Sequence, residues 1–171
     1  QVDLVVALGV LEHVENPLDM MAWAAERLKV GGYFYVRVPN FENNPNDLFC
    51  VDHLSKLTES TLRSLAEHSG FEVLFVEKRG VPIFILLRKT GINKPLRNTF
   101  EKNLATLGAN AKIAQSSINA VLKAREMALE SQSNLAIFGT GASGLFAPFY
   151  ANFALEEITA YIDENQSLWG S

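Results

Sequence analysis

The stretch QVDLVVALGVLEHVENP (residues 1–17) decides the fold, because it begins as an almost unbroken apolar run that stops at Gly9. Such a run is typical of a parallel strand covered by helices on both faces. Asn16 followed by Pro17 predicts a helix start, since Asn caps helix N-termini and Pro suits the first helical position. Ligands bind at the carboxyl ends of strands in open parallel sheets. We therefore expect residues 9–13 to line a site.

The pattern downstream of this start extends the same architecture. It predicts a helix over 17–28 that Gly31 and Gly32 end, and then a strand over 33–38. A long polar loop over 39–52 follows, and after it a helix that Thr58 caps and Gly70 ends. Two strands over 71–78 and 81–87, joined by Arg79 and Gly80, complete this half of the chain. An Arg-Gly turn between two strands favours an antiparallel edge pair on an otherwise parallel sheet. The fold class is α/β.

The second half of the chain begins with a long helical stretch, roughly residues 96–130, with Gly108 as a candidate break. Its apolar stripe is typical of a helical connector, with a homodimer contact as the alternative. A strand at 135–138 then enters the G-x-G-x-x-G loop of residues 139–144, and a second strand at 158–162 ends in Asp163. This order is that of a truncated first βαβ unit of a second Rossmann-like domain.

The glycine loop leaves three interpretations open. Gly139, Gly141 and Gly144, with Asp163, suit a substrate nucleotide or phosphate, or the NAD cofactor. The same glycines also permit tight packing of a helix on a strand with no ligand at all.

Several segments in the first half resemble class I S-adenosylmethionine-dependent methyltransferases. They occur in the order and spacing of that family's fourth strand, following helix, fifth strand, later loop and late strand: Asp3–Val6, Leu11–Val14, Leu28–Phe34, Asp52–Thr58 and Leu62–Val73. The likeness covers about residues 1–90. Together with the residue pattern of the second half, it predicts three parts, namely a late portion of a methyltransferase domain over 1–90, a connector over 91–133, and the truncated second Rossmann-like unit over 134–171.

The resemblance implies S-adenosylmethionine as the cofactor, with Leu8, Gly9 and Val10 at its methionine end. The family's first strand and its glycine-rich donor loop have no counterpart here, so we expect the chain to be a fragment with weakened cofactor binding. The chain is also similar to sugar C-methyltransferases that act on nucleotide-linked deoxysugars, which carry an acid-histidine pair where this chain has Asp52-His53. That likeness implies a nucleotide-linked or glycan sugar as the methyl acceptor.

His13 and His53 are the candidate acid-base residues, because imidazole gains and loses protons near neutral pH. Asp52 is the candidate partner that sets the basicity or tautomer of His53. The alternative for His13 is a helix cap or a bond to a backbone carbonyl. The alternative for His53 is a loop histidine satisfied by local backbone groups, and the rival function is a NAD or sugar-nucleotide binding module without methyltransferase activity.

Composition narrows the classes of partner. The chain of 171 residues has a formal charge of −4, which argues against nucleic acid as the main partner. Its one cysteine, Cys50, excludes an internal disulfide or a cysteine-based zinc site and fits a reducing compartment. No apolar run approaches the roughly 20 residues that cross a bilayer. We expect a cytoplasmic enzyme with no membrane partner and no metal.

Overall fold

The computed structural model of the chain describes residues 1–78, 80–131, 134–139, 148–149 and 152–168. The chain divides into two compact units, one of residues 1–47 and 51–110, and one of residues 48–50 and 111–171. Helix α3 (Phe100–Glu130) contributes residues to both. The functional division at residues 90 and 133 stays a prediction, and each unit is described by itself below.

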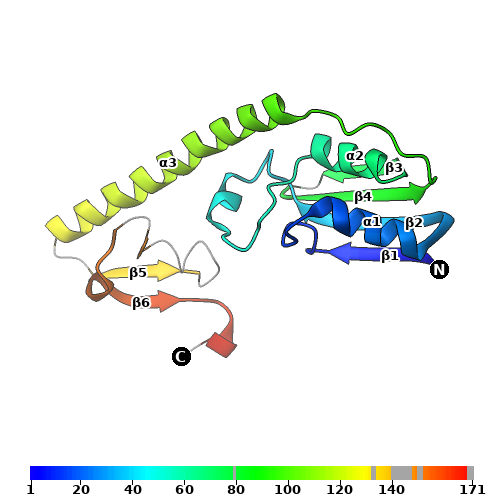
Figure 1. Ribbon diagram of the computed structural model, residues 1–171. Coiled ribbons are helices and arrows are strands. Elements are labelled where there is room, and N and C mark those ends of the chain that lie inside the picture. The colour runs from blue at the N-terminus through cyan, green and yellow to red at the C-terminus, as the bar shows by residue number, and fades with distance from the viewer. Residues whose placement is uncertain (79, 132–133, 140–147, 150–151, 169–171) are drawn as a thin grey trace. The chain divides into compact units, whose positions relative to one another are not determined.

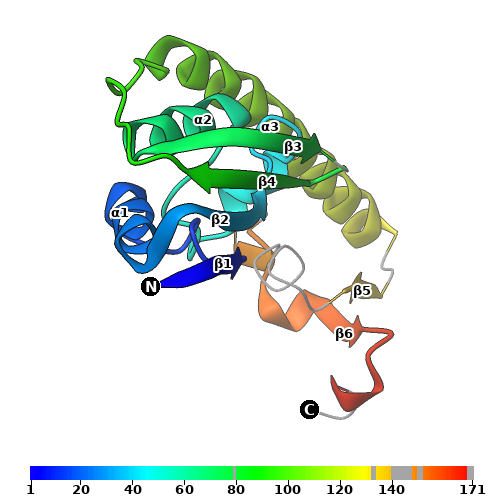
Figure 2. The ribbon, with the colours of Figure 1, turned by 90° about the vertical axis from the view of Figure 1, so that its right-hand side faces the viewer.

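A four-stranded mixed sheet forms the first unit (Figure 1, Figure 2). Its strands lie in the order β1 (Val2–Leu8), β2 (Leu28–Pro39), β4 (Pro82–Lys89) and β3 (Phe71–Lys78). β1 pairs with β2 in parallel, whereas β4 runs antiparallel to both β2 and β3. The predicted antiparallel pair is confirmed, although of its two strands β3 alone is at an edge of the sheet and β4 lies inside it.

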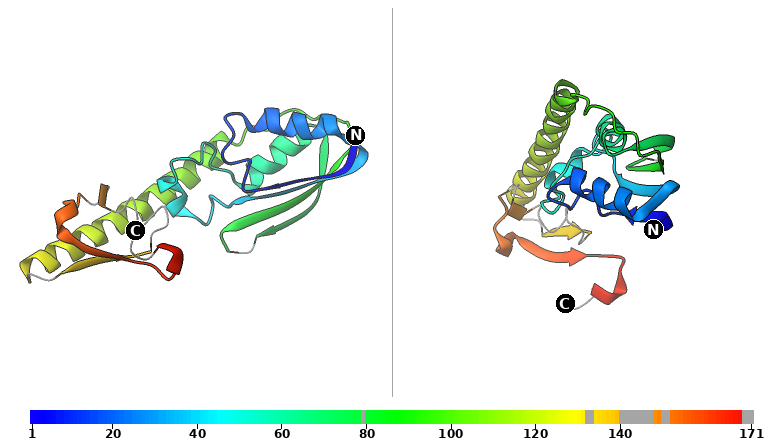
Figure 3. Two further views of the ribbon diagram at one scale, coloured as in Figure 1. Left: turned by 90° about the horizontal axis from the view of Figure 1, so that it is seen from below. Right: turned by 45° about the vertical axis from the view of Figure 1, so that its right-hand side comes forward.

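Both helices of this unit begin where the sequence predicts. The Asn16 side chain accepts a hydrogen bond from the Leu18 N–H at 3.1 Å and caps α1 (Pro17–Arg27). The Thr58 hydroxyl accepts from the Thr61 N–H at 3.2 Å and caps α2 (Glu59–His68). The two helices lie on one face of the sheet (Figure 3), so the described residues cover that face only, and the expectation of a sheet covered on both faces is not met among them.

The start of β2 differs from the prediction. The chain turns extended at Leu28, directly after α1, and Leu28 pairs with Val2 of β1. Gly31 and Gly32 therefore do not end the helix; they lie at a shift in the register between Val2 and Leu4. A Cβ at Gly32 would lie 3.0 Å from the Lys29 carbonyl oxygen and 3.1 Å from the Asp3 carbonyl oxygen, so a side chain there would crowd the backbone at the irregularity.

The core lies between this sheet and its two helices. Its fully buried large side chains come from all of these elements and include Met21, Leu28, Phe34, Val36, Leu62, Phe71, Ile83, Ile85 and Leu87. Alternation along β1 leaves Leu4, Val6 and Leu8 about half exposed while Ala7 is buried.

The second unit contains the later turns of α3 and a parallel pair of strands, β5 (Leu135–Phe138) and β6 (Ile158–Ile162). A 3₁₀ turn at Leu155–Glu157 leads directly into β6, and another at Gln166–Leu168 follows it. α3 passes through Gly108 without a break. An ion pair links α3 to the turn before β6, with Arg125 Nε 2.6 Å from the Glu157 carboxylate. The helix that a βαβ unit has between its two strands would lie mostly outside the described residues.

No helix in the described part of the chain is long and apolar enough to cross a membrane.

Replacing Thr58 by Ala tests the cap of α2, which fixes the end of the loop that leads into the candidate site. The hydroxyl is fully buried and serves the Thr61 N–H. We expect Thr58→Ala to lower the free energy of unfolding by about 1–2 kcal/mol in urea denaturation. Thr58→Ser keeps the oxygen and is the control; equal stability of the two variants would show that the cap contributes nothing.

Acid should weaken an ion pair of α2. The ammonium of Lys78 and the guanidinium of Arg63 donate to the Glu59 carboxylate and hold its pKa below the ordinary value. A lowered folded-state pKa contributes stability above the unfolded-state pKa, and that contribution is lost as the pH falls through the folded-state value. Denaturation curves from pH 6 to pH 3 should therefore show a smaller loss for Glu59→Gln than for the wild type. Equal losses would contradict this assignment.

Candidate functional site

The candidate site begins where β1 ends. Gly9 has a φ of +68°, and its N–H donates to the Arg37 carbonyl of β2 at 2.9 Å. The chain then turns, with the His13 N–H bonded to the Val10 carbonyl at 3.0 Å and Leu11 fully buried as an anchor. A left-handed backbone that any Cβ would strain thus separates the end of the strand from Glu12 and His13.

The loop after β2 returns to this turn. The Ser55 N–H donates to the Glu12 carbonyl at 3.0 Å, and the Phe41 N–H donates to the Leu57 carbonyl at 3.0 Å. Asn40 is fully buried at the beginning of the loop, and its N–H reaches the Val81 carbonyl. These bonds hold residues 52–57 against the end of β1.

His13 and His53, 40 residues apart in the chain, are brought into ring contact. Their ring centroids lie 4.8 Å apart with an interplanar angle of 76°, an edge-to-face arrangement. The structure thus brings together the two histidines that the sequence singles out separately.

The acid beside each histidine ring differs from the pairing that the sequence suggests, in which Asp52 is the partner of His53. Nδ1 of His13 lies 3.0 Å from the Asp52 carbonyl oxygen and 3.5 Å from the Asp52 carboxylate. Nδ1 of His53 lies 2.6 Å from Oδ1 of Asp47. Asp52 therefore contacts His13, and the acid in contact with His53 is Asp47 and not the adjacent Asp52.

Asp47 is the residue that sequence reasoning missed. It lies six residues before His53, in the 3₁₀ turn Pro45–Phe49, and its side chain is only 2% exposed. Lys56 Nζ lies 3.5 Å from the second carboxylate oxygen and also donates to the Asp47 carbonyl. The sequence places Asp47 in a stretch rich in Asn and Pro, and that composition gives no sign that one acid in it is buried.

A pocket of about 190 Å³ opens at the same end of the sheet. Its lining comes from the ends of β1, β2 and β4 and from the loop: Gly9, Glu12, Arg37, Val38, Pro39, His53, Val81 and Pro82. Glu12 is only 4% exposed, and its Oε2 has no hydrogen-bond partner among the described residues. The pocket therefore offers a carboxylate oxygen and an imidazole to a bound molecule that brings a hydrogen-bond donor.

The same residues supply the donor atoms that a cation prefers. Glu12, His13 and His53 each offer one ligand atom within 4.8 Å of the others. A carboxylate with two imidazoles is a set that divalent transition metals accept. Because Nδ1 of each ring is already engaged, the Nε2 atoms would have to be the ligands.

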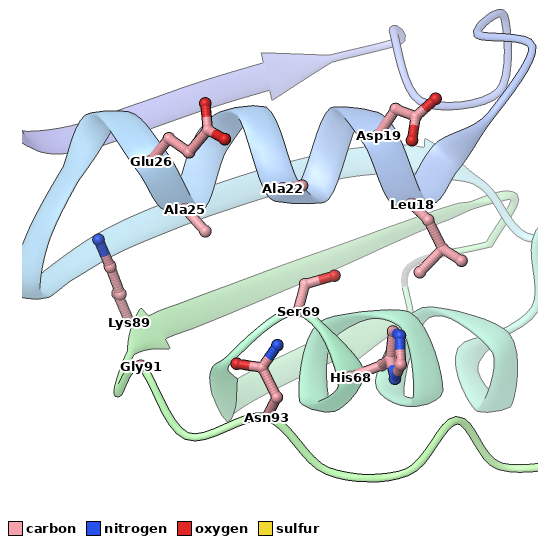
Figure 4. A pocket seen from close by; sticks show the side chains of 10 residues that line it. All are labelled: Leu18, Asp19, Ala22, Ala25, Glu26, His68, Ser69, Lys89, Gly91 and Asn93. Atoms are coloured by element: carbon pink, nitrogen blue, oxygen red, sulfur yellow. The ribbon is translucent and has the colours of Figure 1, made fainter.

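A second, larger pocket of about 450 Å³ runs between α1 and the carboxyl ends of α2 and β4 (Figure 4). Two of its polar side chains are held by backbone carbonyls: Lys89 Nζ donates to Leu28 at 2.7 Å, and His68 Nδ1 lies 3.0 Å from the Lys94 oxygen. None of the site residues predicted from the sequence lines this pocket.

In the second unit, the structure describes two of the four predicted nucleotide-binding residues. Gly139 has a φ of +93°, and its N–H donates to the Ile162 carbonyl at 2.7 Å. The Asp163 carboxylate accepts the Asn165 N–H at 2.8 Å. Gly141 and Gly144 lie outside the described residues, so the glycine loop stays a prediction.

Residues 1–76 match a methyltransferase domain. The matching family model covers β1, α1, β2, the loop and α2, and thus includes His13, Asp47 and His53. No curated protein matches the chain. The match supports a methyltransferase, an activity for which domains of this family typically use S-adenosylmethionine.

Glu12 gives a direct test of the pocket's chemistry. A buried ionised oxygen without a partner costs more free energy than a buried amide. In ligand-free protein, Glu12→Gln should raise the free energy of unfolding by about 1 kcal/mol, whereas the exposed Glu15→Gln should change it by less than about 0.5 kcal/mol. Loss of stability in Glu12→Gln would show that the carboxylate is satisfied within the protein.

Proposed function

We propose that this chain carries the acceptor side of an S-adenosylmethionine-dependent methyltransferase that acts on carbon or oxygen of a nucleotide-linked or glycan sugar. The observation that supports the reaction class most is the coincidence of two findings. Residues 1–76 match a methyltransferase domain, and within that match a pocket with Glu12 and His53 lies at the carboxyl end of β1. This is the end of a strand at which open sheets of this class bind ligands.

Leu8, Gly9 and Val10 are proposed to contact the methionine end of the cofactor. The turn suits such a group, because Gly9 has no side chain to cover its backbone and its φ of +68° is one that residues with a Cβ rarely adopt. Leu8 is 54% exposed and Val10 37% exposed, so apolar surface is available beside the turn. The bound cofactor would supply a methyl group on a positively charged sulfur, which leaves as a neutral thioether.

The chain's own residues act on the acceptor in this proposal. Glu12 accepts a hydrogen bond from an acceptor hydroxyl or amine, which positions the neighbouring atom for attack. His53 takes the proton that the acceptor loses, and His13, whose Nδ1 lies beside the Asp52 carbonyl, packs against the His53 ring. The methyl group gains its new bond to the acceptor, and the proton moves to the imidazole.

The choice of a sugar rests on the resemblance to sugar C-methyltransferases. In the second unit, Gly139 and Asp163 are proposed to bind a substrate nucleotide or phosphate. The rival hypothesis of a NAD-binding module without methyltransferase activity is not favoured, because the domain match supports a methyltransferase.

Calorimetric titration of S-adenosylhomocysteine into the intact gene product tests the reaction class. We expect binding, and we expect Gly9→Ala to weaken it at least tenfold. Gly91→Ala is the matched control, since Gly91 also has a positive φ, +73°, and open space around its Cα. Equal affinity in Gly9→Ala and Gly91→Ala would place the cofactor elsewhere, and no binding by the wild type would remove the proposed function.

A further inference from the structure

We propose that Asp47 is the positioning residue of the site: it fixes the tautomer and orientation of His53 and so presents Nε2 to the pocket. The catalytic consequence rests on the proposed function, whereas the positioning itself can be tested without any activity. The proposal reassigns to Asp47 the role that the chain order gives to Asp52.

The contact itself is short and sheltered. Oδ1 of Asp47 lies 2.6 Å from Nδ1 of His53, and the two side chains are 2% and 16% exposed. A hydrogen bond to a carboxylate is stronger than one between neutral groups, and the low exposure protects it from competition by water. This contact can therefore hold the ring in one orientation.

The carboxylate is itself held in place. The Asp47 N–H donates to the Asn44 carbonyl at 3.1 Å within the loop. Lys56 Nζ lies 3.5 Å from Oδ2, so the buried negative charge has a cation on the side away from the histidine. Because Asp47 is itself held in place, its hydrogen bond can fix the orientation of the His53 ring.

The bond selects one tautomer. An ionised carboxylate has no proton to donate, so Nδ1 of His53 must carry the hydrogen. The lone pair of the neutral ring then lies on Nε2. His53 lines the pocket but Asp47 does not, so Nε2 is the nitrogen left for the pocket's contents.

Asp52 cannot supply the same constraint. Its side chain is 71% exposed, and its contacts are with His13. The His13 and His53 rings meet edge to face, and this contact limits the rotation of the His53 ring. The two histidines thus have separate acids, one buried and one exposed, and only the buried acid can exclude water from its bond.

In the proposed reaction, His53 Nε2 takes the acceptor's proton while the acceptor forms its bond to the methyl group. The ring becomes a cation, and the Asp47 carboxylate at Nδ1 stabilises that charge without taking the proton. This is the logic by which a third group orients a general base in other enzymes.

Nitrogen-15 NMR of the intact gene product, labelled at histidine, is the experiment. Two-bond couplings between ring protons and ring nitrogens identify the tautomer, and His13→Ala, His53→Ala and His68→Ala assign the signals of these three rings among those of the whole protein. We expect His53 to be protonated at Nδ1 when neutral. Asp47→Ala should shift it toward protonation at Nε2, while Asp52→Ala leaves it unchanged.

His68 is the internal reference, because its Nδ1 faces the Lys94 carbonyl and has no contact with Asp47. Its signals should be the same in the wild type and in both aspartate variants. The wild-type spectrum alone already decides the first point if Asp47→Ala fails to fold: Nε2 protonation of neutral His53 would overturn the proposal. A change of the His53 tautomer in Asp52→Ala, with no change in Asp47→Ala, would overturn it as well.

The catalytic consequence has its own measurement. With a methyl acceptor in hand, Asp47→Asn should lower kcat by about 10- to 100-fold, part of the 10²- to 10⁴-fold that a general base supplies, with KM little changed. A rise in KM at constant kcat would assign Asp47 to the binding of the acceptor instead. Loss of S-adenosylhomocysteine binding in the calorimetric test removes the proposed function but leaves the NMR result intact, so the two failures are distinguishable.

Discussion

The parallel pairing of β1 with β2 is the constraint on which the candidate site depends. The register places Leu8 opposite Arg37, and the next N–H, that of Gly9, closes on the Arg37 carbonyl. That bond fixes where the strand stops and where the chain turns toward Glu12. Everything that converges there, the loop after β2 included, is positioned relative to this one end of the sheet.

The loop contributes chemistry because its backbone is tied to that turn. The bond from the Ser55 N–H to the Glu12 carbonyl brings His53 to the end of β1, and the buried Asp47 approaches the ring from within the loop. A site assembled in this way has one carboxylate that is satisfied, on Asp47, and one oxygen, on Glu12, that has no partner in the described structure. The Asp47 carboxylate is suited to orienting a base, and the free oxygen of Glu12 is suited to binding a substrate.

The elements that the sequence predicts well are those with strong local signals. The Asn16 and Thr58 side chains each accept a hydrogen bond from an otherwise unpaired N–H in the first turn of a helix, and Pro17 suits the first helical position. These local contacts mark the starts of α1 and α2 correctly. The antiparallel partnership of β3 with β4 is also correct. By contrast, the local sequence around Gly31 and Gly32 suggests the end of a helix. In the structure these glycines lie where the register shifts between β1 and β2, next to Asp3, and that pairing depends on residues far away in the sequence.

The site shows the same limit of local information. His13 and His53 are identifiable as residues of interest, but their contact depends on how the loop after β2 folds back. Adjacent residues in an irregular segment can point in different directions, so the pair Asp52-His53 suggests a partnership that the structure assigns instead to Asp47 and His53. The sequence does not predict the burial of Glu12 either, because that burial results from the packing of Ser55 and its neighbours against the turn.

The most direct test of this account is a crystal structure of the intact gene product with bound S-adenosylhomocysteine. The account predicts the sulfur of the ligand beside the backbone of Gly9, on the side of the turn where Glu12 and the His53 ring line the pocket. Density for the ligand at the second unit or along α1, with the pocket at the end of β1 empty, would contradict it.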